Sequence, residues 1–504
     1  MVAVNITSPR AELHDIQALL RGGLTELPEA CFLLLRVTDA AAARRWLAEL
    51  DVASAADLGG AKRQTEVVQV AVTASGLRAL GIGDATIALF SAEFVGGLGR
   101  DAARSRRLGD IGPDAPERWD WGSGDREPHV LAMIYAADGG LVALRTRIAT
   151  AAFKAGFAMM RELGTSDMKG REPFGFVDGI SQPAIDWAGS RLPDTDADLD
   201  YGNLIAPGEF VLGYRNEYGK LTERPLLDAA QDPRAAELLP PAAETPSLRD
   251  LGRNGSYLVL RQLDQDVRGF WRFMAAHAGT GAVAMAERIV GRGIDGSPSV
   301  PLQDVPIRGV GPDAEDRAAN EFTFRSDPQG QECPIGAHIR RANPRTGDMP
   351  GGRVGKVGQL LCLAGFGGHA EEDRIAASRF HRLLRRGREY GRFLPWAEAK
   401  ASDAPDPQAG LHFICLNANI GRQFEFIQNA WLQSSKFAGL SGEADPLIGN
   451  RARLPTGAAT DGFALPRAGL PAERLSGVPR FVSVRGGAYF FLPGIRALRY
   501  IAGA

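Results

Sequence analysis

The sequence is poor in cysteine, and this limits the sites that it can build. Its four cysteines, Cys31, Cys333, Cys362 and Cys415, lie far apart and form no CxxC pair. This spacing argues against a structural zinc site and against a disulfide framework, and no CxxCH motif is present for covalent attachment of a cofactor. Three of the four lie in apolar runs, where a cysteine behaves as a small hydrophobic residue. We therefore expect the cysteines to be structural.

A strong net charge, long apolar runs and an export leader are also missing. The net charge of -2 gives no electrostatic reason to bind nucleic acid or an anionic membrane. No apolar run reaches the roughly 20 residues that a membrane-spanning helix needs. The start, MVAVNITSPRAELHD, has neither a basic segment followed by an apolar one nor a twin-arginine pair. These absences predict a cytoplasmic protein without a nucleic-acid or membrane partner.

The chain is too long for one hydrophobic core, and it reads as two halves that mix strands and helices. It has 504 residues, of which 44% are hydrophobic and 23% charged, as in ordinary globular proteins. Runs rich in leucine and β-branched residues predict strands at 31–37, 66–73, 129–136, 210–215, 255–263 and 410–420. Helical patterns occupy 39–50, 140–163, 264–279 and 424–434. The pair Gly486-Gly487 predicts a hairpin within 480–493.

A stretch rich in proline and acidic residues, at 221–247, interrupts this pattern. We interpret it as a linker or a surface excursion. The sequence therefore predicts two α+β domains, at 1–225 and 226–504.

One acid stands inside an apolar, glycine-punctuated run, FGFVDGISQPAI, at 174–185. A buried carboxylate such as Asp178 is costly unless a nearby group uses its charge or its proton. The simpler alternative is a tight turn in which Asp178 caps neighbouring backbone amides.

Among seven histidines, His338 stands out by its neighbours in CPIGAHIRRANPR, at 333–345. Small residues before it leave room for a large group to approach the ring, and the arginines after it can bind the carboxylates of a ligand. The alternative is a basic surface loop with one incidental histidine.

A third element, FHRLLRRGREYG at 380–391, carries Arg385 and Arg386 at the end of an apolar run. A buried guanidinium needs a partner, although a solvated basic helix end is the simpler interpretation. A histidine with adjacent arginines is what a haem iron and its propionates require. An aspartate and an arginine on the opposite face would serve a bound peroxide. The residues alone do not choose this chemistry over other acid–base sites.

These three elements resemble known motifs. FGFVDGISQP resembles the GxxDG motif of the dye-decolorizing peroxidases, which are haem enzymes that use hydrogen peroxide. CPIGAHIRRANPR and HRLLRRGREYG resemble the axial-ligand and distal-arginine segments of that family. Segments at 14–23, 208–219, 410–431 and 480–498 resemble its long-chain bacterial and fungal members, in the same order. The resemblance covers nearly the whole chain, and it implies two ferredoxin-like α+β domains with antiparallel sheets, peripheral helices and a haem pocket mainly in the second.

The family resemblance also implies an activity and a site. The activity is reduction of hydrogen peroxide through a high-valent iron–oxo intermediate, with oxidation of dyes, phenols or other one-electron donors. The cofactor is one non-covalent haem b per chain. The implied site residues are Asp178 as distal acid–base, Arg385 as distal cation, His338 as the iron ligand, Leu411 and Phe413 as pocket walls, and Arg340 and Arg345 as partners of the propionates.

Several assignments stay open at this stage. Arg386 and Arg382 are alternatives to Arg385 as the distal cation. A ligating histidine normally donates its other N–H to a carboxylate or carbonyl, for which Asp445 is the candidate, with Glu443 behind it.

Electrons from bulky donors would need a relay, and Tyr390 and Trp396 are candidates, with plain packing as the alternative. The segment 346–379 is longer and more apolar than the resemblance leads us to expect, and it would cover or reshape the haem entrance. A monomer and a homodimer are both open.

Two rival functions also remain. One is a non-catalytic haem-binding protein that carries, stores or senses haem, which would not need Asp178 together with Arg385. The other is a haem-free α+β protein. Failure to bind haem would favour the haem-free protein. Haem binding without reaction with peroxide would favour the non-catalytic haem-binding protein.

Overall fold

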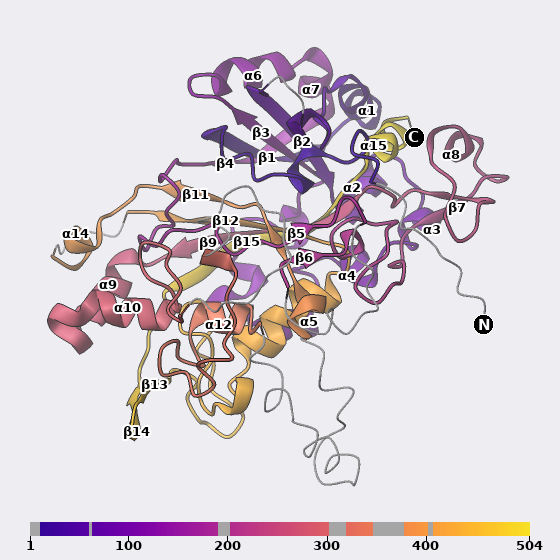
Figure 1. Cartoon of the computed structure of the whole chain (residues 1–504). Helices are drawn as coiled ribbons and strands as arrows, with labels where there is room; N and C mark the ends of the chain where they lie inside the picture. The colour runs from indigo at the N-terminus through magenta and orange to yellow at the C-terminus, as the bar shows by residue number, and fades with distance from the viewer. Residues whose placement is uncertain are drawn as a thin grey trace, which may run out of the picture.

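The computed structural model of the chain describes residues 11–59, 63–189, 202–301, 319–345, 377–401 and 407–503. Its centre is a nine-stranded sheet with the strand order β10-β12-β9-β15-β2-β3-β1-β4, and β11 pairs with β12 beside this path (Figure 1). All strand pairs within this sheet are antiparallel. The chain is therefore an α+β protein, as the sequence predicts.

The first half of the sheet has a ferredoxin-like arrangement. Its elements, in chain order, are β1 (Glu29–Val37), α1 (Ala40–Glu49), β2 (Glu66–Val72), β3 (Val130–Ala136), α6 (Leu141–Ile148), α7 (Ala151–Gly156) and β4 (Phe157–Gly164). The strand order β2-β3-β1-β4 with helices after β1 and β3 is the split β-α-β pattern. The helices α1, α6 and α7 cover one face of these strands, at the top of Figure 1.

The second half repeats the arrangement. Its elements are β9 (Ser256–Gln265), α9 (Val267–Ala278), α10 (Ala282–Val290), β10 (Leu384–Arg385), β11 (Arg388–Gly391), β12 (Ala409–Asn417), the wide π-type turns η11 (Gly421–Glu425) and η12 (Ile427–Gln433), and β15 (Val482–Leu492). The order β10-β12-β9-β15 matches that of the first half. Phe491 of β15 pairs with Val72 of β2, which joins the halves into one sheet.

Shorter elements surround this sheet. Among the described residues the remaining α-helices are α2 (Ala74–Ala79), α3 (Asp84–Ile87), α4 (Ala92–Gly96), α5 (Ala102–Leu108), α8 (Pro233–Leu238), α12 (His338–Ala342), α14 (Trp396–Ala401) and α15 (Ile495–Ala502). The remaining strands are β5 (Ala184–Ile185), β6 (Leu204–Ile205), β7 (Leu226–Asp228), β8 (Leu248–Asp250), β13 (Phe463–Arg467) and β14 (Leu470–Leu475). The acid- and proline-rich stretch forms β7 and α8, which project from the body of the molecule at the right of Figure 1.

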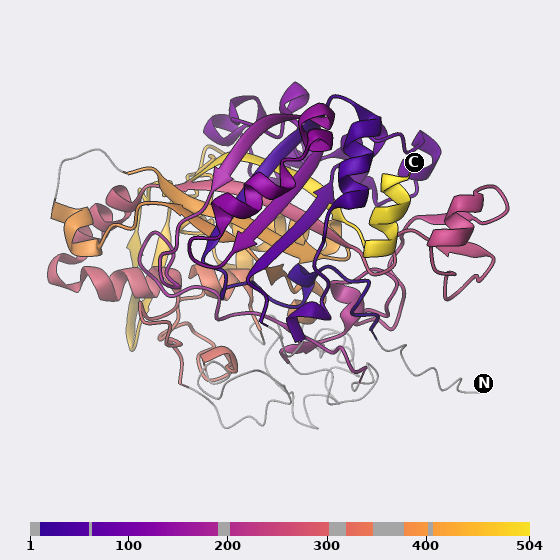
Figure 2. The same ribbon diagram turned by 90° about the horizontal axis from the view of Figure 1, so that it is seen from above.

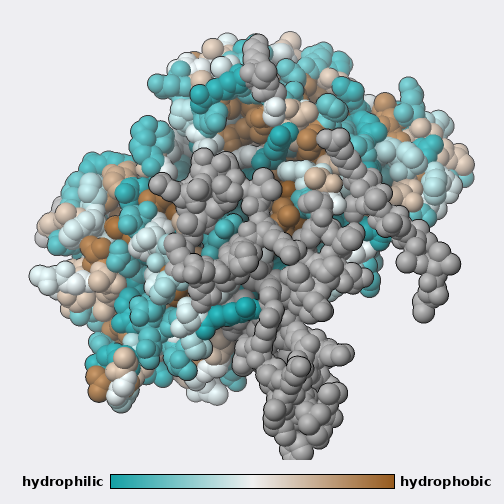
Figure 3. Space-filling view, viewed as in Figure 1, coloured by the Kyte–Doolittle hydropathy of each residue, from teal (hydrophilic) through white to brown (hydrophobic). Residues whose placement is uncertain are grey.

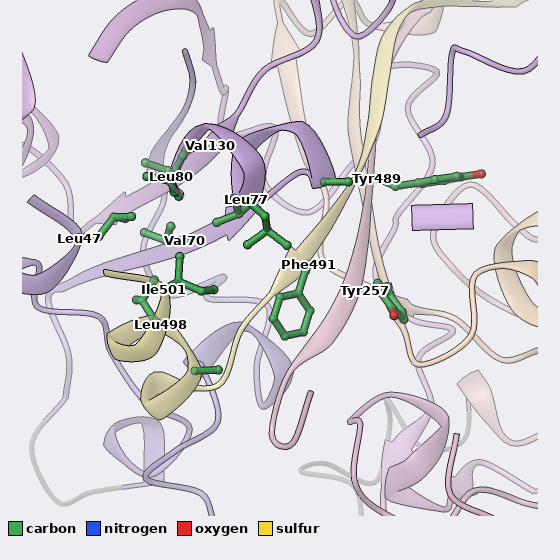
Figure 4. Packing of buried hydrophobic residues seen from close by; sticks show 14 of the residues in the cluster. Leu47, Val70, Leu77, Leu80, Val130, Tyr257, Tyr489, Phe491, Leu498 and Ile501 are labelled. Carbon is green, nitrogen blue, oxygen red and sulfur yellow. The ribbon is translucent and has the colours of Figure 1, made fainter. Parts of the chain in front are cut away.

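The C-terminal helix α15 ties the end of the chain to the first half. It lies beside α1, as the yellow and indigo helices in Figure 2 show. Its Leu498 and Ile501 lie with Val70 of β2 and Leu47 of α1 in one buried cluster (Figure 4). The same cluster contains Tyr257 of β9, so the two ferredoxin-like halves share a core. The domain boundary at residue 225 stays a prediction.

The expected hairpin within 480–493 is wrong, because β15 runs unbroken from Val482 to Leu492 with a bulge between Val484 and Gly486. The two glycines serve close packing instead of a turn. A Cβ at Gly486 would lie 2.4 Å from Nε1 of Trp121, and a Cβ at Gly122 would lie 2.1 Å from the carbonyl oxygen of Gly487. Glycine is needed where another backbone or ring approaches a strand this closely.

Two further predictions of local structure fail. The helical pattern at 140–163 ends at Gly156, and Phe157–Gly164 continue as the edge strand β4. A short apolar run does not by itself distinguish an edge strand from the end of a helix. The predicted strand at 210–215 is a series of turns, in which Leu212 N–H donates to the carbonyl of Gly255.

The helices in the described part of the chain include no candidate for a membrane-spanning segment. None of the helices there is both long enough and apolar enough to cross a bilayer. In the view of Figure 3, described side chains are mostly hydrophilic, and the hydrophobic ones form small separate patches.

Candidate active site

A cavity lies against one face of the second half of the sheet. Its walls include side chains of β9, β12 and β15, the loop that carries the FGFVDG motif, the short helix α12 and the π-type turns of η12. In Figure 1 α12 lies below the strands β9, β12 and β15. The cavity brings together Asp178, His338, Arg385, Leu411 and Phe413, which are far apart in the sequence.

Asp178 and Arg385 form an ion pair on the cavity wall. Nη1 of Arg385 donates to Oδ1 of Asp178 at 3.0 Å, and 31% and 32% of the two side chains are exposed. Because both residues line the cavity, this exposure makes the pair accessible to a small molecule inside it. Burial raises the pKa of Asp178, but the Arg385 guanidinium and the Gly179 N–H outweigh burial and hold this pKa below its usual value. Asp178 is therefore ionised at neutral pH.

The motif itself aligns this pair. Oε1 of Gln182 accepts a hydrogen bond from the backbone N–H of Arg385 at 3.0 Å, so the same loop holds both the guanidinium and the backbone of Arg385. Arg385 lies in β10 opposite Cys415 of β12, which fixes its direction. Gly179, next to Asp178, has a φ of 83°, a conformation that a residue with a Cβ adopts at a cost.

His338 begins α12 and is held by Asp445. Its Nδ1 lies 3.0 Å from Oδ2 of Asp445, and the carboxylate also accepts the N–H groups of Leu447 and Ile448, both at 2.9 Å. Burial lowers the pKa of His338, but the Asp445 carboxylate outweighs burial and raises it. In the neutral ring the contact with Asp445 keeps the proton on Nδ1 and leaves the lone pair on Nε2, and none of the described residues forms a hydrogen bond with Nε2. Asp445, and not Glu443, is therefore the partner of His338.

The sheet supplies an apolar wall beside the ion pair. Leu411 and Phe413 of β12, Leu263 of β9 and Val484 of β15 all line the cavity. Tyr390 and Trp396, the candidate relays, are not among the described lining residues. Tyr390 stacks on His412 with ring centroids 4.5 Å apart.

Arg340 and Arg345 form hydrogen bonds with neighbouring loops. Arg340 donates to the carbonyl of Cys333 at 2.7 Å and to Asp327, and Arg345 donates to the carbonyl of Phe322 at 2.8 Å. Neither is among the described residues that line the cavity. The assignment of these two arginines as partners of the propionates stays a prediction. Residues 346–376 of the expected insertion lie outside the described residues.

Several polar side chains of the cavity wall have no counterpart among the sequence predictions. These are Arg292, Ser378 and His381, whereas Arg382, which also lines the cavity, was an alternative to Arg385 as the distal cation. Arg292 donates to Ser181 Oγ at 3.1 Å, and Arg382 donates to Asn203 Oδ1 at 3.1 Å. Arg382 lies within the quoted arginine segment, but nothing in the sequence distinguishes a cavity-facing arginine from its neighbours.

A second ion pair, Asp110–Arg261, has no counterpart among the sequence predictions. Both side chains are buried, both line the cavity, and Arg261 lies opposite Phe413 in the sheet. Burial raises the pKa of Asp110 to about 6 in spite of Arg261. Asp110 and Arg261 are far apart in the chain and on different elements, so no local pattern predicts their pairing.

The arrangement suits acid–base chemistry on a small molecule bound next to a metal. Asp178 can accept a proton, Arg385 can stabilise negative charge, and His338 Nε2 can donate its lone pair to a metal.

Comparisons with known proteins found relatives that are named peroxidases, although no family model matches the chain. Dye-decolorizing peroxidase msp1 of Mycetinis scorodonius is 29% identical over 98% of this chain and 88% of its own length. Multifunctional dye peroxidase DyP2 of an Amycolatopsis species is 31% identical over 67% of this chain and 62% of its own length.

Solved structures agree on the fold. An ancestral D-type dye-decolorizing peroxidase superposes with a TM-score of 0.70 and 26% identity, over 97% of this chain and 99% of that chain. A dye-decolorizing peroxidase in complex with 2,6-dimethoxyphenol superposes with a TM-score of 0.70 and 24% identity, over 98% of this chain and all of that chain.

Proposed function

The chain belongs to the dye-decolorizing peroxidase family, and we propose that it is a haem peroxidase that reduces hydrogen peroxide with electrons from dyes, phenols and other one-electron donors. The observation that carries this proposal is the Asp178–Arg385 ion pair, which lines the same cavity as His338. A protein that only stores or carries haem needs a histidine ligand but has no use for this pair. The relative bound to 2,6-dimethoxyphenol supports a phenol as one donor.

The residues of the cavity fit one non-covalent haem b. His338 offers Nε2 as the single protein ligand, with its tautomer fixed by Asp445. Within the described ranges, no three His, Cys, Asp or Glu side chains gather where they could hold a metal ion, so a metal here would come with its own macrocycle. Arg292 and Arg382, together with Ser378, are the cavity-lining groups suited to its propionates.

Haem, when bound, supplies an open iron position for peroxide and stores the oxidising equivalents. The chain supplies the proton transfer. The ionised Asp178 takes a proton from one oxygen of hydrogen peroxide through the carboxylate oxygen that Arg385 does not occupy, and it returns this proton to the other oxygen, which leaves as water. Arg385 stabilises the negative charge that develops between these two steps. Leu411 and Phe413 line the cavity that holds this pair and would surround a peroxide molecule bound next to it.

The test is to titrate haem into the purified protein and its His338→Ala variant, and then to add hydrogen peroxide with 2,6-dimethoxyphenol. We expect the wild type to bind one haem per chain and to oxidise the phenol only when peroxide is present. The His338→Ala variant should bind haem weakly or not at all. Tight haem binding by the wild type without oxidation of the donor would support the haem-carrier alternative instead.

A further inference from the structure

A second carboxyl group, Glu172, lies on the cavity wall in the same loop as Asp178. Its carboxylate accepts the N–H of Phe174 at 3.1 Å, the N–H of Phe176 at 3.0 Å and the amide Nε2 of Gln265 at 2.9 Å. Gln265 belongs to β9 and also lines the cavity. The position of Glu172 is therefore fixed from two elements.

The chain contains a loop of the same form without a carboxylate at this position. In both 171–175 and 215–219, the first arginine donates through Nη1 to the carbonyl of the last glycine, and that glycine has a positive φ. In the second loop Asn216 follows the arginine, and its Oδ1 accepts two backbone N–H groups at 3.0 and 3.1 Å. A neutral amide thus suffices to close such a loop. The carboxyl group of Glu172 is not required for the local fold.

The surroundings allow Glu172 to exist in both protonation states. Burial raises its pKa to about 7, hydrogen bonds from Gln265 and the two amides act in the opposite direction, and the charge of Asp178 on the same loop adds to the rise. The donors from β9 and from the loop are neutral. Oε1 of Gln265 is buried and has no hydrogen-bond partner among the described residues. If the side-chain amide of Gln265 flips by about 180°, this oxygen can accept a hydrogen bond from the O–H of a protonated Glu172.

The proposed reaction needs a group of this kind. Hydrogen peroxide, two electrons and two further protons give two molecules of water, so each turnover takes up two protons that peroxide does not bring. We infer that Glu172 is the proton-uptake group of the site. The carboxylic acid of Glu172 transfers its proton to the oxygen that is being reduced, and the resulting carboxylate then takes up a new proton from solvent. Asp178 moves the protons that peroxide itself brings. This inference rests on the proposed peroxidase function.

The experiment compares the haem-loaded wild type with Glu172→Gln, which can close the loop as Asn216 does. Stopped-flow spectroscopy follows the reaction with peroxide and then the return to the resting state with ferrocyanide, a donor that supplies electrons without protons. We expect Glu172→Gln to leave the peroxide step within a few-fold and to slow the return by roughly 10²-fold, a usual contribution of a general acid. In the resting enzyme, infrared spectroscopy should show a carboxylic-acid band that titrates near neutral pH in the wild type and is missing in the variant.

A second variant, Gln265→Leu, keeps the acid and removes one hydrogen bond to its ionised form. This substitution should raise the pH at which the infrared band titrates. It should raise by the same amount the pH above which the return to the resting state becomes slower. An unchanged return rate and an unchanged infrared band in Glu172→Gln would overturn the inference. So would an equal slowing of the peroxide step. A wild type that binds no haem or does not react with peroxide would refute the peroxidase function itself, which is a separate result.

Discussion

At the scale of single residues, the proposed proton transfer makes the pH range of the peroxide step depend on the ionisation of Asp178. Asp178 must be ionised to accept a proton, so the rate is full above its pKa and falls as the pH drops through it. Because the Arg385 guanidinium holds this pKa below its usual value of 3.8, the acidic limb of the rate should lie below pH 3.8 in the wild type.

In Arg385→Leu the burial of Asp178 remains and the compensating charge is lost, so the acidic limb should move to higher pH. Stopped-flow rates of the peroxide reaction, measured from about pH 3 to about pH 8, test this shift. A limb at the same pH in both proteins would contradict the assignment of Arg385 as the group that controls Asp178.

A second prediction at this scale concerns Asp445. The Asp445→Asn variant replaces an acceptor of His338 and of two backbone N–H groups with a side chain that carries an NH₂ group, so His338 loses its orientation. Loss of such a partner typically weakens metal binding by about 10–100-fold. The rate of haem transfer to an excess of a haem-scavenging protein measures this loss.

Glu443→Gln is the matched control for Asp445→Asn. The carboxylate of Glu443 accepts the N–H of Ala464 at 3.0 Å and contacts Arg474, but it does not contact His338. Its haem transfer rate should equal that of the wild type. Equal losses in the two variants would mean that the loop around Asp445, and not the contact with His338, holds the cofactor.

At the scale of elements, the glycines of β15 decide how the first half of the chain packs on the second. A Cβ at Gly486 would meet the buried indole of Trp121, whose Nε1 donates to Gln262 at 2.8 Å. Gly486→Ala should lower the free energy of unfolding by about 1–3 kcal/mol, the usual cost of overpacking. Urea unfolding followed by tryptophan fluorescence measures it.

Gly164→Ala, in the edge strand β4, is the control for this substitution. A Cβ there meets no atom within 4 Å, so the substitution should be neutral or slightly stabilising. A loss of stability equal to that of Gly486→Ala would show that strand glycines matter here for reasons other than close packing.

The two carboxyl–arginine pairs show what the sequence can and cannot predict at this scale. Asp178 stands in a local context that makes burial costly, and the motif around it therefore points to a functional acid. Asp110 and Arg261 have no such context, because their pairing depends on where α5 ends relative to β9. The hairpin expected at Gly486-Gly487 failed for the same reason, since the ring that fills the space beside the glycine comes from Trp121 in the other half.

At the scale of the whole molecule, the class of fold and the order of elements follow from the sequence, but the closure of the two halves into one sheet does not. The strand ladder between β15 and β2, both within the described residues, consists of the single residue pair Phe491–Val72. The cavity depends on the same long-range geometry, because its walls come from β9, β12 and β15, α12 and the Asp178 loop. Sequence motifs singled out His338, Asp178 and Arg385, which line this cavity, whereas no sequence pattern pointed to Arg292 and Glu172 on the same wall.

Proton transfer by Asp178 during the reaction of peroxide is the step on which the proposed function depends. The most direct measurement mixes equimolar hydrogen peroxide with the haem-loaded wild type and with haem-loaded Asp178→Asn, and follows the Soret band. We expect both proteins to hold the same amount of haem and the Soret band to change roughly 10²–10⁴-fold more slowly in Asp178→Asn. Equal rates at equal haem content would contradict it.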